Sequence, residues 1–213
     1  MNTTSEHAIR TILVGQSGGP TAAINASLAG VVRAAHAQGL RVLGMRNGIQ
    51  GFLEDNVVNL TEVLELTASE SEGSEQAPTN SGKKNLQLLR KTPSSWLGSC
   101  RFKLPDLGTD LAASSEPAAT SPIYQQIDAQ LKKYQVDAVL YIGGNDSMDT
   151  TDKLSRYFAQ VESHVRVVGV PKTIDNDLEG TDHTPGFGSA ARFVASVTAE
   201  LTRDGGVYNS KNV

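Results

Sequence analysis

The chain has 213 residues, 38% of them apolar, and a formal net charge of −4. This is enough for one large domain with its own core, and the charge provides no basic surface for nucleic acid. No stretch approaches the roughly 20 apolar residues of a membrane span, and the N-terminus lacks the basic start and apolar middle of a signal peptide. Cys100 is the only cysteine, so no internal disulfide can form and a reducing, cytoplasmic compartment is expected.

The N-terminal region predicts a strand, a glycine turn, a helix and a second strand. Residues 11–14 are a short β-branched run, followed by Gly-Gln-Ser-Gly-Gly-Pro at 15–20. Apolar residues then recur at helical spacing from Ile24 to about Gln38. Gly39 suits the end of this helix, and residues 41–45 have the composition of the next strand.

The middle of the chain is more polar. Residues 67–82 are nearly free of large apolar side chains and are predicted to be an exposed loop, with a second exposed loop at 111–122. Between the loops we expect a short helix at 84–91 and a glycine-containing segment at 96–101.

The C-terminal half alternates helices with apolar strands. We predict helices at 123–134, 147–160 and 187–201, the last with an apolar face, and strands at 136–142 and 165–170. Apolar strands without alternation, separated by helices, are typical of a parallel sheet covered on both faces. The predicted fold is therefore a doubly wound, mainly parallel α/β domain that spans residues 1–213.

Two glycine motifs follow predicted strands. The residues at 15–19 could present backbone N–H groups and a helix N-terminus to a phosphate, but they lack the Gly-Lys-Ser/Thr ending of a P-loop. Taken alone, this motif is better explained by a tight turn. Gly-Gly-Asn-Asp-Ser at 143–147 repeats the design. A helix cap by Asp146 or Ser147 would explain one polar residue there but not the paired glycines.

The most informative motif is Pro-Lys-Thr-Ile-Asp-Asn-Asp at 171–177. A capped turn or an incidental metal-binding loop is the simpler alternative. However, phosphoryl transfer needs a carboxylate to accept the proton of the acceptor hydroxyl, and cations to stabilise the phosphate charge. This segment supplies two carboxylates and one lysine within a few residues, which favours a functional site.

These three motifs, with Gly-Ser-Cys-Arg at 98–101 and the segment at 180–187, occur in the order found in phosphofructokinases. The resemblance extends from about residue 11 to residue 213. It implies the N-terminal lobe of an enzyme of glycolysis that reversibly phosphorylates the 1-hydroxyl of fructose 6-phosphate, giving fructose 1,6-bisphosphate. It also implies a Mg²⁺ requirement and a homo-oligomer.

The resemblance assigns roles to individual residues. Asp175 would be the base that accepts the proton of the sugar hydroxyl, with Thr173 and Asp177 on the sugar-phosphate side. The residues expected to bind the phosphate donor are Gly18, Gly19, Arg101, Gly144 and Ser147.

Two positions indicate the donor. ATP-dependent members of the family have glycine where this chain has Asp146 and Lys172. A carboxylate at Asp146 would lie near the α-phosphate of ATP and repel it, whereas Lys172 would offer a cation to the transferred phosphoryl group. The resemblance therefore implies pyrophosphate as the donor and places Asp146 and Lys172 with Asp175 among the catalytic residues.

One position departs from the family. Asn145 stands where the family usually has an aspartate that is associated with magnesium. Mg²⁺ keeps several waters and takes much of its binding from substrate phosphates, so we expect Mg²⁺ dependence with Asn145 as a weak ligand at most.

Two alternatives stay open at this point. The chain could come from an ATP-dependent enzyme, or from a non-catalytic regulatory subunit that binds sugar phosphate. The presence of Asp175 argues against the second, because binding alone needs no base. The family's acceptor site also uses a Met-Gly-Arg segment and a second lobe, which residues 1–213 do not contain. We therefore expect the isolated chain to be inactive.

Overall fold

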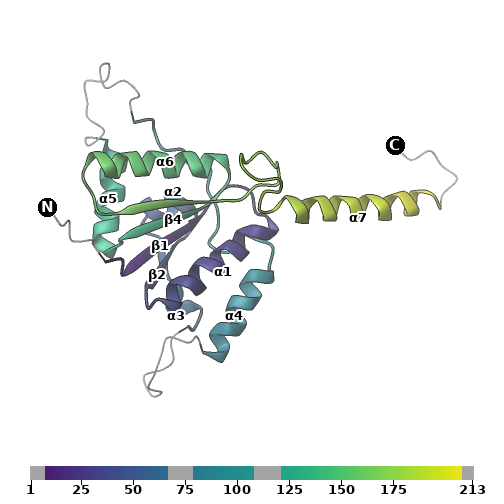
Figure 1. The fold of residues 1–213 in the computed structure, drawn as a ribbon, viewed down its shortest axis with the longest axis horizontal. Helices are drawn as coiled ribbons and strands as arrows, with labels where there is room; N and C mark the ends of the chain where they lie inside the picture. The colour runs from purple at the N-terminus through teal and green to yellow at the C-terminus, as the bar shows by residue number, and fades with distance from the viewer. Residues whose placement is uncertain (1–7, 67–78, 108–120, 208–213) are drawn as a thin grey trace.

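A computed structural model describes residues 8–66, 79–107 and 121–207, which form a sheet flanked by helices (Figure 1). The elements in chain order are β1 (Thr11–Gln16), α1 (Ala22–Ala37), β2 (Arg41–Met45), α2 (Gly48–Leu53), β3 (Val57–Asn59), α3 (Leu60–Val63), α4 (Asn80–Lys91), α5 (Pro122–Tyr134), β4 (Ala138–Gly143), α6 (Asn145–Gln160), β5 (Arg166–Pro171) and α7 (Phe187–Gly205).

The five strands have the order β3-β2-β1-β4-β5. Strands β2, β1, β4 and β5 are parallel, and β3 pairs with β2 in the antiparallel direction. The chain thus places β2 and β3 on one side of β1, and then β4 and β5 on the other side. This confirms the predicted doubly wound fold. It also creates a switch point between the carboxyl ends of β1 and β4, where ligands bind in such sheets.

Two hydrophobic cores cover opposite faces of the sheet. Alternate residues of β1 face opposite ways, with Leu13 in one core and Ile12 and Val14 in the other. The Leu13 core includes side chains of α2, α5 and α6, and the Val14 core includes side chains of α1, α3 and α4. Because β1 is buried on both faces, its residues 12–14 form a continuous apolar run instead of alternating with polar residues.

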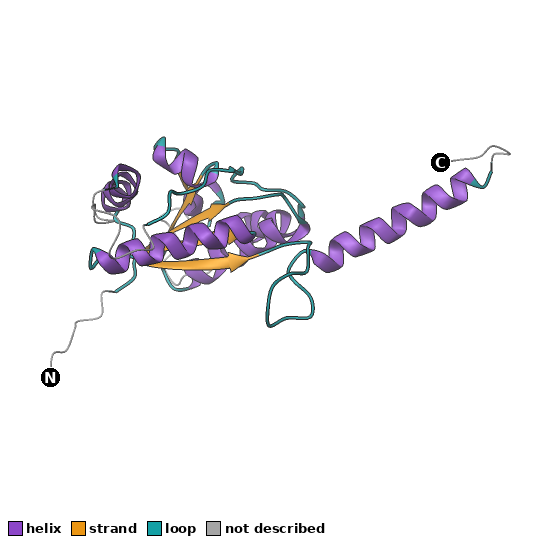
Figure 2. Cartoon of the chain, turned by 90° about the horizontal axis from the view of Figure 1, so that it is seen from above, coloured by secondary structure: helices purple, strands orange, loops and turns teal. Residues whose placement is uncertain are grey.

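The coverage is incomplete at β5. Strand β5 lies at the edge of the sheet, and its Val168 is 49% exposed. The predicted C-terminal helix is present as α7, but none of its residues is buried, and Phe193, Val194 and Leu201 are exposed. Figures 1 and 2 show α7 extending away from the rest of the chain instead of packing on β5. Helices therefore cover both faces of the sheet at β1, β2 and β4, as predicted, but cover β5 only in part.

The predicted loops are only partly described. Residues 67–78 and 111–120 lie outside the described residues. Helix α4 begins at Asn80, inside the predicted 67–82 loop, because the Thr79 side chain caps it by accepting a hydrogen bond from the N–H of Gly82 at 2.8 Å. Helix α5 begins at Pro122, the last residue of the other predicted loop. Among the helices in the described ranges, none is both long and apolar enough to cross a membrane.

Candidate active site

The two glycine loops meet at the switch point. The backbone N–H of Ser17, just after β1, donates to the carbonyl of Ile142 in β4 at 2.9 Å. Gly18 has a φ of 79°, which L side chains rarely adopt. A Cβ atom on Gly18 would lie 3.4 Å from Nζ of Lys172 and 3.7 Å from the backbone nitrogen of Gly144. The loops after β1 and β4 and the lysine after β5 therefore converge on one place.

Helix α6 begins at this place without a side-chain cap. Its N-cap residue is Gly144, so Asp146 and Ser147 lie in the first turn and neither is the cap. The simpler explanation of this motif, a helix cap by one of these side chains, is therefore wrong. The N-terminus of α6 keeps backbone N–H groups that an anion could accept hydrogen bonds from.

Ser147 lies below the surface of the loop. Its side chain is buried, and its Oγ has no hydrogen-bond partner among the described residues. A Cβ atom on Gly143 would be 1.9 Å from this Oγ, so Gly143 is glycine because Ser147 packs against it. The predicted contact of Ser147 with the phosphate donor would therefore have to come from a buried side chain.

Lys172 is the buried cation of the site. Its side chain is 5% exposed, and its Nζ donates to the carbonyl of Gly19 at 2.6 Å. Its backbone N–H donates to the carbonyl of Gly143 at 2.9 Å. Burial lowers the pKa of Lys172, and the nearby charge of Asp175 opposes that shift. The lysine is thus fixed between the two glycine loops with its ammonium group at the switch point.

The segment after Lys172 is closed by its own hydrogen bonds. The N–H of Thr173 donates to the carbonyl of Pro185 at 3.0 Å, and Oγ1 of Thr184 donates to the carbonyl of Thr173 at 2.8 Å. Asn176, which has a φ of 56°, donates from its side chain to the carbonyl of Asp182 and accepts from the N–H of Thr184. These bonds hold residues 173–186 as a compact loop.

The two carboxylates that were predicted to act at the site lie in the first part of this loop. Asp175 and Asp177 are both exposed. Oδ2 of Asp177 accepts a hydrogen bond of 2.9 Å from Nδ2 of Asn145, at the start of α6. Asp177 is therefore tied to the start of α6, while the carboxylate of Asp175 is exposed to solvent. The N–H of Asp175 donates to Oγ1 of Thr173, which gives Thr173 a structural contact beside its predicted substrate role.

A buried polar network positions the segment that carries Arg101. Gln16 donates to Oδ1 of Asn25 at 3.1 Å and accepts from the N–H of Leu97 at 2.8 Å, while Asn25 accepts from the N–H of Trp96 at 2.9 Å. Both amide side chains are buried. Sequence reasoning missed this network, because a glutamine and an asparagine nine positions apart carry no recognisable signal.

The same segment contacts the first glycine loop directly. Oγ of Ser99 donates to the carbonyl of Gly18 at 2.6 Å, and Oγ of Ser17 donates to the carbonyl of Cys100 at 3.2 Å. Arg101, which is exposed, follows immediately. Two residues further on, Nζ of Lys103 lies 3.0 Å from Oδ1 of Asp146. Lys103 was not predicted from the sequence, because only the fold brings it next to Asp146.

The structure thus brings together residues from four separate segments. Gly18 and Gly19 come from the loop after β1, Arg101 from the segment after α4, Gly144, Asn145 and Asp146 from the start of α6, and Lys172, Thr173, Asp175 and Asp177 from the segment after β5. All four meet at the carboxyl ends of parallel strands. The arrangement offers cations and backbone N–H groups to phosphate, and carboxylates to a hydroxyl group or a cation.

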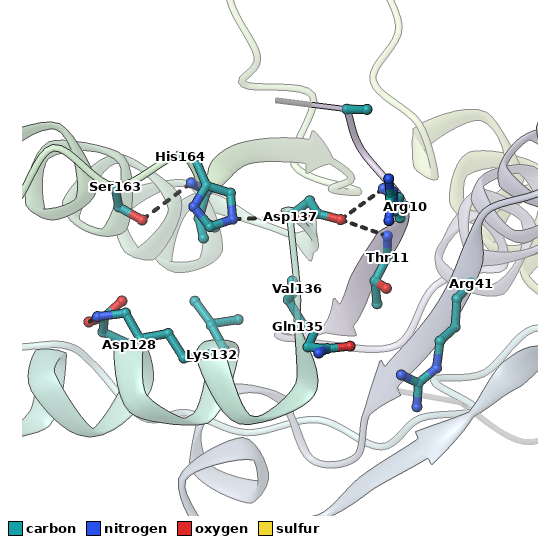
Figure 3. A pocket seen from close by; sticks show the side chains of 13 residues that line it. Arg10, Thr11, Arg41, Asp128, Lys132, Gln135, Val136, Asp137, Ser163 and His164 are labelled. Carbon is teal, nitrogen blue, oxygen red and sulfur yellow. Dashed lines mark hydrogen bonds and ion pairs between the residues drawn. The ribbon is translucent and has the colours of Figure 1, made fainter. Parts of the chain in front are cut away.

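A separate pocket lies at the other end of the sheet. It has a volume of about 620 Å³ and lies at the amino ends of the strands, where residues that include Arg10, Lys132 and His164 line it (Figure 3). Asp137 accepts hydrogen bonds from the N–H groups of Arg10 and Thr11 there, at 2.8 and 2.9 Å. None of the predicted site residues lines this pocket.

Comparisons with known proteins agree with this geometry. The chain is similar to the pyrophosphate–fructose 6-phosphate 1-phosphotransferase of Xanthomonas campestris pv. campestris (strain B100), with 39% identity over 193 residues, 91% of this chain and 40% of that protein. An ATP-dependent 6-phosphofructokinase of Aliivibrio salmonicida (strain LFI1238) is 32% identical over 193 residues, 91% of this chain and 48% of that protein. The chain therefore spans less than half the length of these relatives.

A solved structure is similar over the same region. The pyrophosphate-dependent phosphofructokinase from Nitrosospira multiformis matches with a TM-score of 0.69 and 32% identity, over 92% of this chain and 42% of that one. The sequence model described as phosphofructokinase matches residues 11–206. The chain belongs to the phosphofructokinase family.

Proposed function

We propose that this chain forms the donor half of an enzyme that transfers a phosphoryl group from pyrophosphate to the 1-hydroxyl of fructose 6-phosphate. The observation that carries the proposal is the position of Lys172, whose buried ammonium group contacts the first glycine loop. A cation there can bind the transferred phosphoryl group without needing to reorganise. The greater identity to the pyrophosphate-dependent relative than to the ATP-dependent one supports the same donor.

The reaction follows from the groups at the site. Asp175 accepts the proton of the 1-hydroxyl, and the oxygen of that hydroxyl attacks the terminal phosphorus of pyrophosphate. A new bond forms between this oxygen and phosphorus while the bond from phosphorus to the bridging oxygen breaks. Orthophosphate leaves with that electron pair. Lys172 and Arg101 stabilise the negative charge on the phosphate oxygens. The reverse reaction uses the same groups, with Asp175 returning the proton.

The residues present fit a Mg²⁺ requirement. Asp177 uses one carboxylate oxygen to accept the hydrogen bond from Asn145, which leaves its other oxygen for a cation. Asp177 would hold the metal, with the amide oxygen of Asn145 as a weaker ligand. Mg²⁺ needs only one or two carboxylates when substrate phosphates and waters complete its coordination. When bound, it would neutralise phosphate charge. We propose further that the protein works in the cytoplasm as a homo-oligomer.

The choice between donors rests on Asp146 and Lys172. The alternative, an ATP-dependent enzyme, would need space and a favourable charge for the rest of a nucleotide next to the first turn of α6. Asp146 places a carboxylate there. The third possibility is a subunit that only binds sugar phosphate. Such a subunit would not need a proton acceptor, so it does not explain the exposed carboxylate of Asp175 near a buried lysine.

The test is an assay of the full-length protein with fructose 6-phosphate and Mg²⁺, in which pyrophosphate and ATP are compared as donors. We expect formation of fructose 1,6-bisphosphate with pyrophosphate, little with ATP, and loss of the reaction when a chelator removes Mg²⁺. Efficient turnover with ATP would support the ATP-dependent alternative. Binding of sugar phosphate without turnover by either donor would support the regulatory subunit.

A further inference from the structure

The carboxylate of Asp146 raises a problem for any phosphate donor. It lies in the first turn of α6, two residues after Gly144. A bare carboxylate at this position would repel the phosphate groups of ATP, but it would repel pyrophosphate as well, because both are polyanions. The charge of Asp146 alone therefore does not explain how the site could admit one donor and reject the other.

Lys103 solves this problem by pairing with the carboxylate. Nζ of Lys103 lies 3.0 Å from Oδ1 of Asp146, and the two side chains are 68% and 71% exposed. Exposed ion pairs of this kind contribute little to the stability of a fold. The significance of this pair therefore lies in its location, next to the uncapped N-terminus of α6, where the donor would bind.

The backbone on either side of Lys103 is anchored. Leu104 and Leu107 are buried in the core beneath α5 and α6, and the carbonyl of Leu104 accepts a hydrogen bond of 3.1 Å from Nζ of Lys153. On the other side, Cys100 is buried and its carbonyl accepts a hydrogen bond from Ser17. Lys103 is thus presented to Asp146 by a fixed segment, although its side chain is exposed.

The charges of the site show what Lys103 contributes. The site contains the carboxylates of Asp146, Asp175 and Asp177, and the loop at 173–186 also carries Glu179 and Asp182. Without Lys103 the cations assigned to the site are Arg101 and Lys172. Lys103 adds a third cation and pairs with Asp146, which lowers the repulsion of a small polyanion at the first turn of α6.

We propose that Lys103 is a specificity-determining residue that neutralises Asp146, so that the pair blocks the nucleotide side of the site by its volume while pyrophosphate can still bind. This inference rests on the proposed function, because it concerns the donor of that reaction. The pair acts as a neutral obstacle, and Arg101 and Lys172 keep their charges free for the phosphate groups.

The test measures KM and kcat for pyrophosphate in the full-length protein. In Lys103→Met we expect KM to rise about five- to tenfold at low salt with kcat nearly unchanged, because an unpaired carboxylate then repels the donor across a screened distance. The rise should shrink at high ionic strength, and Lys103→Arg should restore KM. The double variant Lys103→Met/Asp146→Asn should also recover, because no bare carboxylate remains.

A matched control is Lys132→Met. Lys132 is 71% exposed and pairs with Asp128 at the pocket of Figure 3. This pocket is at the amino ends of the strands, so the KM of Lys132→Met for pyrophosphate should equal that of the wild type. An unchanged KM in Lys103→Met would overturn the inference. An equally raised KM in the double variant and in Lys103→Met would also overturn it, because Lys103 would then contact the donor itself rather than neutralise Asp146.

The inference can fail separately from the proposed function. If the wild-type protein shows no turnover with pyrophosphate, the proposed function fails, and equilibrium dialysis with radiolabelled pyrophosphate still compares the same variants. Weaker binding to Lys103→Met than to the wild type, with recovery in the double variant, would then support the role of Lys103. Equal binding to all variants would contradict it.

Discussion

Nζ of Lys172 donates a hydrogen bond of 2.6 Å to the carbonyl oxygen of Gly19, although the two residues are 153 positions apart in the chain. The contact joins the segment after β5 to the loop after β1, across the intervening strand β4. A buried ammonium group that uses one of its three protons on a backbone carbonyl keeps the others for a ligand. The order of the strands therefore brings together the residues of the proposed donor site.

The lowered pKa of Lys172 predicts a pH dependence. Its ammonium group must be protonated to attract pyrophosphate, and burial moves its pKa below the ordinary value of 10.5. We therefore expect kcat/KM for pyrophosphate, which reports the free enzyme, to fall with rising pH along a limb centred below 10.5. Lys172→Arg should move that limb to higher pH, because arginine stays protonated. A limb at the same pH in both proteins would show that another group titrates.

The same shift has a consequence for stability. Between the lowered pKa of folded Lys172 and 10.5, the unfolded chain binds more protons than the folded one. The contribution of Lys172 to the free energy of unfolding should therefore rise with pH through this window. Denaturant unfolding at several alkaline pH values compares the wild type with Lys172→Met, which should lack this contribution. A larger rise in Lys172→Met than in the wild type would contradict the assignment.

Asp175 is expected to act in the chemical step. Asp175→Asn keeps the shape of the side chain but removes the proton acceptor, so kcat in the full-length protein should fall by about 10²–10⁴-fold with a modest change in KM. Steady-state kinetics with pyrophosphate and fructose 6-phosphate measure both parameters. A large loss of sugar-phosphate binding with kcat intact would instead make Asp175 a binding residue.

Asp137 is expected to stabilise the amino end of the sheet. Its Oδ2 accepts hydrogen bonds from the N–H groups of Arg10 and Thr11, and its Oδ1 lies 3.6 Å from Nε2 of His164 (Figure 3). Asp137→Ala leaves these part-buried donors without their acceptor, so the free energy of unfolding should fall by about 1.5–3 kcal/mol.

Asp152→Ala is the control for this prediction. Asp152 is 51% exposed and pairs with Arg156 one helical turn away. Its loss should cost no more than about 0.5 kcal/mol. Chemical denaturation of both variants gives the comparison, and equal losses would show that the Asp137 hydrogen bonds are not the source of the effect.

The fold followed from sequence where the apolar pattern was long and regular. The strand at 11–14 and the helix from Ile24 to about Gln38 are present as β1 and α1. Apolar side chains of both elements are buried in the same hydrophobic core. Strand β3 was missed because its three residues pair in the antiparallel direction with β2 and are too short to show a period. Helix α2 was missed because it has only six residues and begins at Gly48, which, like the preceding Asn47, has a positive φ.

The parts of the site that directly follow predicted strands could be predicted from the sequence. The motifs at 15–19, 143–147 and 171–177 lie at the carboxyl ends of β1, β4 and β5, as a parallel sheet requires. The contacts between these motifs depend on strand order, which periodicity does not give. The pairing of Lys103 with Asp146, and the hydrogen bond from Asn145 to Asp177, therefore appeared only in three dimensions.

The most direct test of the account is the ratio of kcat/KM for pyrophosphate to kcat/KM for ATP, measured in the full-length wild type and in Asp146→Gly/Lys172→Gly. In the proposed function, Asp146 obstructs the nucleotide side and Lys172 stabilises the transferred phosphoryl group. We therefore predict a ratio well above one in the wild type, and a fall of at least about 10²-fold in the variant as the pyrophosphate reaction weakens and ATP gains access. A wild type that uses ATP as well as pyrophosphate, or a ratio that does not change in the variant, would contradict the account.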